Sequence, residues 1–153
     1  VVMGWDQLAQ EAPTKMIFVD HPEANERHAR HFDPLQDELD FDLTVSEPEY
    51  LEFLPKNVHK GTAVQVLAKH LGLKREEVAA IGDYYNDLEM VKWAGLGGAM
   101  GSGAHALKDA ADVVVPGNDA DGLAVFIEQI LTANGSAGRS GAPLAHFLGG
   151  RKE

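Results

Sequence analysis

The stretch Val78-Ala79-Ala80-Ile81-Gly82-Asp83-Tyr84-Tyr85-Asn86-Asp87 decides the fold of this chain. Its first four residues are apolar and predict a short buried strand. The pattern from Asn86 to Ala94 predicts a helix directly after it. A strand that leads into a helix is typical of α/β folds, in which ligands bind at the carboxyl ends of the strands. We therefore expect Asp83, Asn86 and Asp87 at such an edge.

The two carboxylates of this loop indicate a cation site. Asp83 and Asp87 are separated by about one helical turn, so both side chains can face the same point. Like charges at short range repel each other unless a cation lies between them, and Mg²⁺ is the usual ion for oxygen ligands. Asn86 suits a phosphate oxygen or a metal-bound water. Structural roles are compatible with this hypothesis, because Asp83 could cap the helix and Asp87 could pair with its dipole.

Lys60 and Asn118 are the other candidate site residues. Lys60 precedes a helical pattern from Gly61 to Leu71 that Gly72 ends. Taken alone, Lys60 is best interpreted as a solvated lysine. Beside an acidic loop, it is expected to supply an ammonium group that neutralises a phosphoryl group during transfer. Asn118 follows another apolar strand, although Gly117-Asn118-Asp119 is also ordinary turn chemistry.

The remaining pattern divides the chain into two parts. The first reads β-α-β-β, with Pro22 in the first turn of the helix. The second alternates strands and helices, which predicts right-handed crossovers and a parallel sheet. The expected class is α/β, a Rossmann-like parallel sheet with flanking helices plus a smaller α/β part. The segment 15–20 is expected to be a buried strand. Further strands are expected at residues 41–45, 50–54, 78–81, 96–100 and 112–115, and helices at 23–39, 61–71, 86–94, 105–110 and 121–131.

Composition excludes several classes of function. The formal charge of −11 argues against general nucleic-acid binding and against anionic membranes. The chain has no cysteine, which excludes disulfides and thiolate chemistry. There is no apolar run of membrane-spanning length and no secretory signal, so a cytoplasmic protein is expected. Of the seven histidines, His28 and His31 are interpreted as surface residues, and His59 has no partner that the sequence reveals.

Several motifs together resemble the haloacid dehalogenase superfamily, and in particular its Cof-type phosphatases. In that family an α/β cap is inserted between the halves of a Rossmann-like core. The resemblance implies that Lys60 stabilises phosphate, that Asp83 binds Mg²⁺, and that the Asn86–Asp87 pair supports both. It also implies that Asn118 faces the site. The motifs are Leu54-Pro55-x-x-Val58-x-Lys60-Gly61, Ile81-Gly82-Asp83-x-x-Asn86-Asp87-x-x-Met90, Ala99-Met100-Gly101, Ala110-Ala111-Asp112 and Asp121-Gly122.

One motif of that family does not occur in these 153 residues. The nucleophile of the family lies in Asp-x-Asp-Gly-Thr, whereas the Asp-x-Asp strings here are Asp40-Phe41-Asp42 and Asp119-Ala120-Asp121. We therefore expect the chain to begin inside the cap. The expected division is an N-terminal remnant (1–14), a partial cap (15–55), the C-terminal part of the core (56–132) and a flexible tail (133–153). The strand 78–81 would then have an open edge.

Three hypotheses follow. The favoured one is a Mg²⁺-dependent hydrolase of small phosphate monoesters that works through an aspartyl-phosphate. An absent N-terminal segment, or another chain, would complete the sheet, and the absent segment would supply the nucleophile, so the chain alone is expected to be inactive. The second is a non-catalytic binding or assembly module with the same fold. The third is a related phosphomutase or sugar-phosphate phosphatase, which these residues do not separate from the first.

Overall fold

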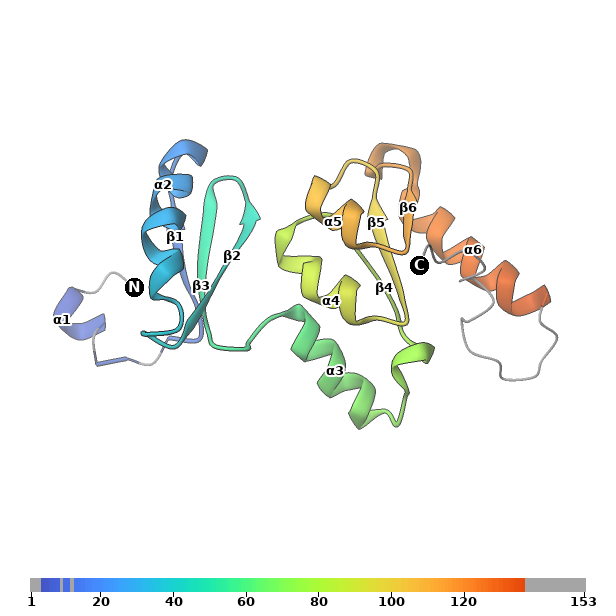
Figure 1. The fold of residues 1–153 in the computed structure, drawn as a ribbon, viewed down its shortest axis with the longest axis horizontal. Coiled ribbons are helices and arrows are strands. Elements are labelled where there is room, and N and C mark those ends of the chain that lie inside the picture. The colour runs from blue at the N-terminus through green and yellow to red at the C-terminus, as the bar shows by residue number, and fades with distance from the viewer. Residues whose placement is uncertain (1–3, 9, 12, 137–153) are drawn as a thin grey trace. The chain divides into compact units, whose positions relative to one another are not determined.

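The computed structural model of the protein describes residues 4–8, 10–11 and 13–136. The chain divides into two compact units, Val1–Val58 and His59–Glu153 (Figure 1). This division lies three residues beyond the expected boundary between residues 55 and 56. Helix α6 continues to Ser136, which places residues 133–136 of the expected tail in a helix. The rest of that tail lies outside the described residues.

The first unit is an antiparallel sheet with one long helix. In chain order it contains α1 (Trp5–Leu8), β1 (Met16–Val19), α2 (Pro22–Phe32), a 3-10 helix (Asp33–Leu35), β2 (Phe41–Glu47) and β3 (Tyr50–Pro55). The strand order is β1-β3-β2. This is the β-α-β-β arrangement that the sequence predicts, with Pro22 at the start of α2.

An aromatic cluster holds this unit together. The ring of Phe18 in β1 lies 5.8 Å from that of Phe32 in α2 and 4.7 Å from that of Phe53 in β3. Phe32 and Phe53 are 5.0 Å apart and almost perpendicular, the edge-to-face geometry that aromatic quadrupoles favour. Leu51 is fully buried in the central strand. The helix is therefore fixed to one face of the sheet by rings from three elements.

Two expectations for this unit were wrong. The segment 15–20 was expected to be a buried strand, but Met16, Ile17 and Val19 are exposed. β1 is an edge strand, and the side chains of a strand alternate between the two faces of the sheet, so α2 covers only part of it. The helix expected over 23–39 ends at Phe32. Pro34 lacks the N–H group that would continue the α-helical ladder, and a 3-10 helix replaces it.

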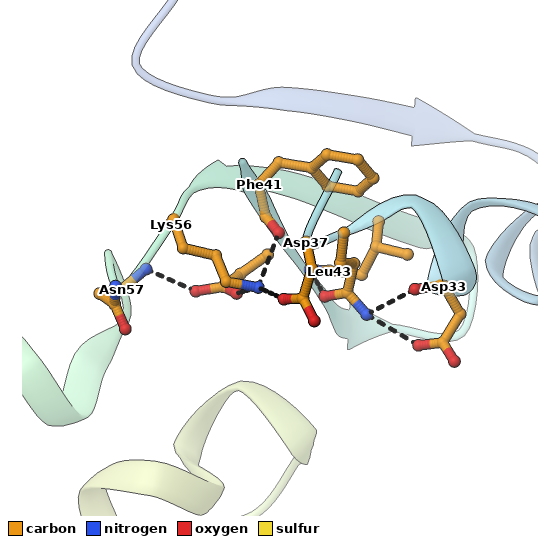
Figure 2. Close-up of polar contacts among 8 residues, drawn as sticks. Asp33, Asp37, Phe41, Leu43, Lys56 and Asn57 are labelled. Carbon is orange, nitrogen blue, oxygen red and sulfur yellow. Dashed lines mark hydrogen bonds and ion pairs between the residues drawn. The ribbon is translucent and has the colours of Figure 1, made fainter. Parts of the chain in front are cut away.

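Lys56, directly after β3, ties the end of that strand to the start of the neighbouring strand β2 (Figure 2). Its ammonium donates to Asp37 Oδ1 at 2.8 Å and lies 3.2 Å from Asp42 Oδ1. The backbone N–H of Asn57 donates to Asp42 Oδ2 at 2.6 Å, and Asn57 adopts a left-handed φ of 62°. The hydrogen bond from Lys56 lowers the pKa of Asp37, and its two carboxylate partners raise the pKa of Lys56.

The second unit is a parallel α/β structure, as the sequence predicts. It contains α3 (Lys60–His70), β4 (Ala79–Gly82), α4 (Leu88–Trp93), β5 (Leu96–Met100), α5 (His105–Ala110), β6 (Val113–Val115) and α6 (Gly122–Ser136). Short 3-10 helices span Arg75–Glu77, Tyr85–Asp87 and Asn118–Ala120. The strand order is β4-β5-β6 and both pairings are parallel. Gly72 follows α3 with a φ of 69°, consistent with the predicted C-cap.

Helices cover both faces of this sheet. On one face Leu96 and Met100 pack with Val115 and with Phe126 of α6. On the other, Ala99 packs with Val91 of α4 and Leu107 of α5. Gly97 and Gly98 in β5 allow α4 and α6 to approach the sheet closely from its two faces. A Cβ on Gly97 would lie 2.3 Å from the Val91 carbonyl oxygen, and one on Gly98 would lie 2.7 Å from the Phe126 ring.

β4 is an edge strand. Within the described residues it pairs only with β5, which agrees with the open edge expected from the sequence. Exposed apolar side chains also lie on α3 and its C-cap (Val66, Leu67 and Leu71) and on α6 (Leu123, Ile127 and Leu131). None of the helices in the described part of the chain combines the length and apolar character that a membrane crossing requires.

Replacing Lys56 with methionine should return the pKa of Asp37 to its ordinary value. The pKa of Asp37 is lowered in the folded protein. Its ion pair with Lys56 therefore stabilises the unit fully when the pH is above the ordinary pKa of 3.8, and this stabilisation is lost as the pH falls through the lower, folded pKa. A carboxyl-detected NMR titration of both proteins would measure the shift. Asp20 is the internal control, because its pKa is lowered mainly by the backbone N–H of His21. An unchanged Asp37 titration would contradict the assignment.

Candidate functional site

The buried carboxylate of Asp87 is the centre of the candidate site. Its Oδ1 accepts a 2.5 Å hydrogen bond from the Lys60 ammonium. Its Oδ2 accepts from the backbone N–H groups of Asp83, at 3.0 Å, and Tyr84, at 3.4 Å. Asp87 is only 4% exposed, whereas the Lys60 side chain is 51% exposed. The carboxylate therefore fixes the ammonium in place while part of the lysine stays open to solvent.

The end of β4 leaves room for this carboxylate. Gly82 is the last residue of the strand, and a Cβ built there would lie 2.3 Å from the Asp87 Cβ and 2.6 Å from its Oδ2. Real Cβ atoms do not approach so closely, so only glycine is accommodated. The chain then turns through a 3-10 helix, which directs the Asp87 side chain back at the Asp83 and Tyr84 backbone. The position of the Asp87 side chain therefore requires glycine at residue 82.

The loop after β5 supports the loop after β4. The backbone N–H of Ala104 donates to the Asp83 carbonyl at 2.8 Å. A Cβ on Gly103 would lie 2.6 Å from the same oxygen, so the two loops can pass this close only with glycine at that position. Gly117, after β6, lies close to Ser102 in the same way. The loops at the carboxyl ends of all three strands therefore adjoin one another.

The other predicted site residues make fewer contacts. The Asp83 side chain is exposed, and no hydrogen bond to its carboxylate is found among the described residues. Asn86 is half-buried in the 3-10 helix, and Asn118 is exposed at the start of the 3-10 helix after β6. The structure therefore brings Lys60 and Asp87 into contact, and it leaves Asp83 and Asn118 as exposed groups at the same end of the strands.

Asp83 and Asp87 are not equivalent candidates for a metal. Both oxygens of Asp87 already accept hydrogen bonds, one from an ammonium, whereas the Asp83 carboxylate is open. Within the described residues there is no group of three or more acidic or histidine side chains that could hold a metal ion. Mg²⁺ in proteins commonly takes one or two carboxylates and completes its shell with water and substrate phosphate. The residues fit such an ion: Asp83 would be its direct ligand, because its carboxylate is exposed, whereas both Asp87 oxygens already accept hydrogen bonds.

Three local features were not foreseen. Asp83 does not cap a helix, since Tyr84 is the N-cap of the 3-10 helix. His59 does have a partner, because its Nδ1 accepts from the backbone N–H of Thr62 at 3.3 Å. Asp112 accepts from the Gly97 N–H at 2.9 Å and so ties β5 to the start of β6. The spacing of His59 and Thr62, which matches a capping box, is a signal that could have revealed the second feature.

Comparison with known proteins agrees with this architecture. A family model for haloacid dehalogenase-like hydrolases matches residues 5–127. A putative phosphatase of Haemophilus influenzae is 43% identical over 84 residues, which cover 55% of this chain and 32% of that protein. The chloroplastic endoribonuclease YBEY of Arabidopsis thaliana is 38% identical over 128 residues, which cover 81% of this chain and 21% of that protein.

Solved structures agree as well. A haloacid dehalogenase-like hydrolase from Bacteroides thetaiotaomicron is 37% identical, with a TM-score of 0.62 over 83% of this chain and 48% of that one. The chain belongs to the haloacid dehalogenase-like hydrolase family. It spans less than half the length of each of these three relatives.

Replacing Gly82 with alanine should disrupt the site from within the strand. The new methyl group would collide with the Asp87 side chain, and overpacking of this kind costs about 1–3 kcal/mol. Chemical denaturation followed by circular dichroism would measure the loss. Gly135→Ala is the matched control, because a Cβ there meets nothing within 4 Å. Equal stability of the Gly82 variant and the wild type would contradict the steric argument.

Proposed function

We propose that this chain is the metal- and phosphate-binding part of a Mg²⁺-dependent hydrolase of small phosphate monoesters. The observation that carries the proposal is the contact between Lys60 and Asp87. A buried carboxylate holds a half-exposed ammonium at the carboxyl end of a parallel sheet, next to the open carboxylate of Asp83. Such a pairing of positive and negative groups suits a phosphate dianion and its cation.

Each residue has a separate role in this proposal. Lys60 binds a phosphate oxygen and offsets the charge that develops during transfer. Asp87 holds Lys60 and orders the backbone of the loop. Asp83 holds Mg²⁺, which when bound supplies Lewis-acid stabilisation of the phosphoryl group. Asn86 and Asn118 are proposed to orient the phosphate through their side-chain amides.

The nucleophile is proposed to come from outside these residues. An aspartate would attack phosphorus, the ester oxygen would leave as the alcohol, and water would then hydrolyse the aspartyl-phosphate to inorganic phosphate. The open edge of β4, together with exposed apolar side chains on α3 and α6, supports the proposal that a further strand of a longer protein or of another chain completes the sheet. The cap-like first unit is proposed to help select the substrate.

A non-catalytic binding module is the second candidate. The observation that favours it is the absence of an Asp-x-Asp-Gly-Thr motif from the 153 residues. In that case the acidic loop would bind a cation only for structure. Hydrolysis of phosphate esters by a longer chain that contains the Asp-x-Asp-Gly-Thr motif would support the hydrolase. The binding module would show no such hydrolysis.

Inorganic phosphate should bind to the chain in the presence of Mg²⁺. Lys60→Met should weaken this binding about tenfold or more, the factor that corresponds to a lost hydrogen bond to a charged group. Asp83→Ala should remove the Mg²⁺ dependence of binding without changing the thermal midpoint. Isothermal titration calorimetry measures the phosphate affinities with and without Mg²⁺, and thermal unfolding followed by circular dichroism measures the midpoint. Lys69→Met, in the last turn of the same helix, is the control for lost charge. Equal affinities for the wild type and Lys60→Met would refute the role of Lys60.

The chain alone should not turn over p-nitrophenyl phosphate, because it lacks the nucleophile motif. The assay would use highly purified chain with saturating Mg²⁺ and would follow p-nitrophenolate. Asp83→Ala serves as the control for contaminating phosphatases, since their activity would be identical in both preparations. Hydrolysis by the wild type that disappears in Asp83→Ala would overturn the proposal that the nucleophile is supplied from elsewhere.

A further inference from the structure

His59 forms a reciprocal cap at the start of α3. Its backbone N–H donates to Thr62 Oγ1 at 3.1 Å, and the Thr62 backbone N–H donates back to His59 Nδ1 at 3.3 Å. The Thr62 hydroxyl also donates to the His59 carbonyl at 2.8 Å. The His59 backbone is extended, with φ −145° and ψ 170°, as is usual for an N-cap residue. An imidazole thus occupies a position that Ser, Thr, Asp or Asn usually fills.

The geometry assigns one protonation state to this ring. Nδ1 can accept a hydrogen bond only when it carries no proton, so the cap requires a neutral imidazole with its proton on Nε2. Protonation would turn the acceptor into a second donor that faces the Thr62 N–H. The cap would then be lost, whereas an asparagine at the same position would keep its carbonyl acceptor at every pH.

Lys60 is the residue directly after this cap. It is the first residue of α3, so the position of its Cα depends on the first turn that His59 and Thr62 close. The ammonium must cross from that turn to Asp87 in the 3-10 helix after β4. If the first turn frayed, the Cα of Lys60 would no longer have a fixed position. The contact between the Lys60 ammonium and the buried Asp87 carboxylate would then weaken.

We infer that His59 is a positioning residue that, through its neutral imidazole, holds the first turn of α3 so that Lys60 presents its ammonium at the site. The role of this positioning in phosphate binding rests on the proposed function, whereas the hydrogen bonds between His59 and Thr62 are independent of it. The charged groups on the elements packed against α3 are Asp87, Glu89 and Lys92, and α3 itself carries Lys60, Lys69 and His70. Because the cap needs an Nδ1 that carries no proton, protonation of the ring by acid should release it.

The test compares His59→Ala, which cannot cap, with His59→Asn, which caps but does not titrate. NMR of the full chain would report hydrogen exchange at the Thr62 amide and the side-chain ammonium signal of Lys60 as a function of pH. We expect exchange at Thr62 to be about fivefold faster in His59→Ala, the ratio that corresponds to a typical lost cap. His59→Asn should restore wild-type exchange and the Lys60 signal, and should remove their loss at acid pH. His70→Ala, at the other end of the helix, should match the wild type.

Three outcomes would decide the inference. Restoration by asparagine, together with a Thr62 protection factor that no longer changes with pH, supports it. A Lys60 signal that is unchanged in His59→Ala, or a wild-type acid transition that persists in His59→Asn, overturns it. A titration with inorganic phosphate and Mg²⁺ separates the proposed function: if no variant or wild-type chain binds phosphate while the Lys60 signal still follows the cap, the positioning role stands and the phosphate role fails.

Discussion

The Asp87 carboxylate fixes the geometry at the carboxyl end of the parallel sheet in the second unit. A buried carboxylate is costly unless its oxygens are hydrogen-bonded, and here one oxygen takes an ammonium and the other takes two backbone N–H groups. The same contacts fix the loop after β4 and the side chain of Lys60. Stability and site geometry are therefore consequences of one group. A side chain with a single acceptor oxygen at position 87 could not serve both partners equally well.

This arrangement separates two acidic residues that look alike in the sequence. Asp83 contributes its backbone to the structure, as donor to Asp87 and acceptor from Ala104, and leaves its carboxylate exposed. Asp87 contributes its side chain to the structure and has little exposed surface. A ligand that enters the site would therefore meet a fixed ammonium and one available carboxylate. The division of roles comes from the turn between the two residues, not from their chemical type.

Much of the fold follows from local pattern. The alternation of apolar runs and amphipathic segments predicted the parallel sheet of the second unit, and the β-α-β-β order of the first agrees as well. The exposure of β1 could not be predicted, because an apolar strand looks the same at an edge as in the centre. The sequence identified Lys60, Asp83 and Asp87 as candidate site residues. It did not predict that Asp87 would be buried against Lys60 while the Asp83 carboxylate stays exposed. The spacing of Asp83 and Asp87 suggested a helical turn, whereas a 3-10 helix directs the second carboxylate onto the backbone of the first.

Each unit is one continuous segment of the chain, with the division at Val58 and His59. All the contacts of Lys60 and Asp87 described above lie within the second segment, and the Lys56 network lies within the first. A chimaera of two homologues joined at this junction would therefore take the Lys60–Asp87 pair whole from one parent and its first 58 residues whole from the other.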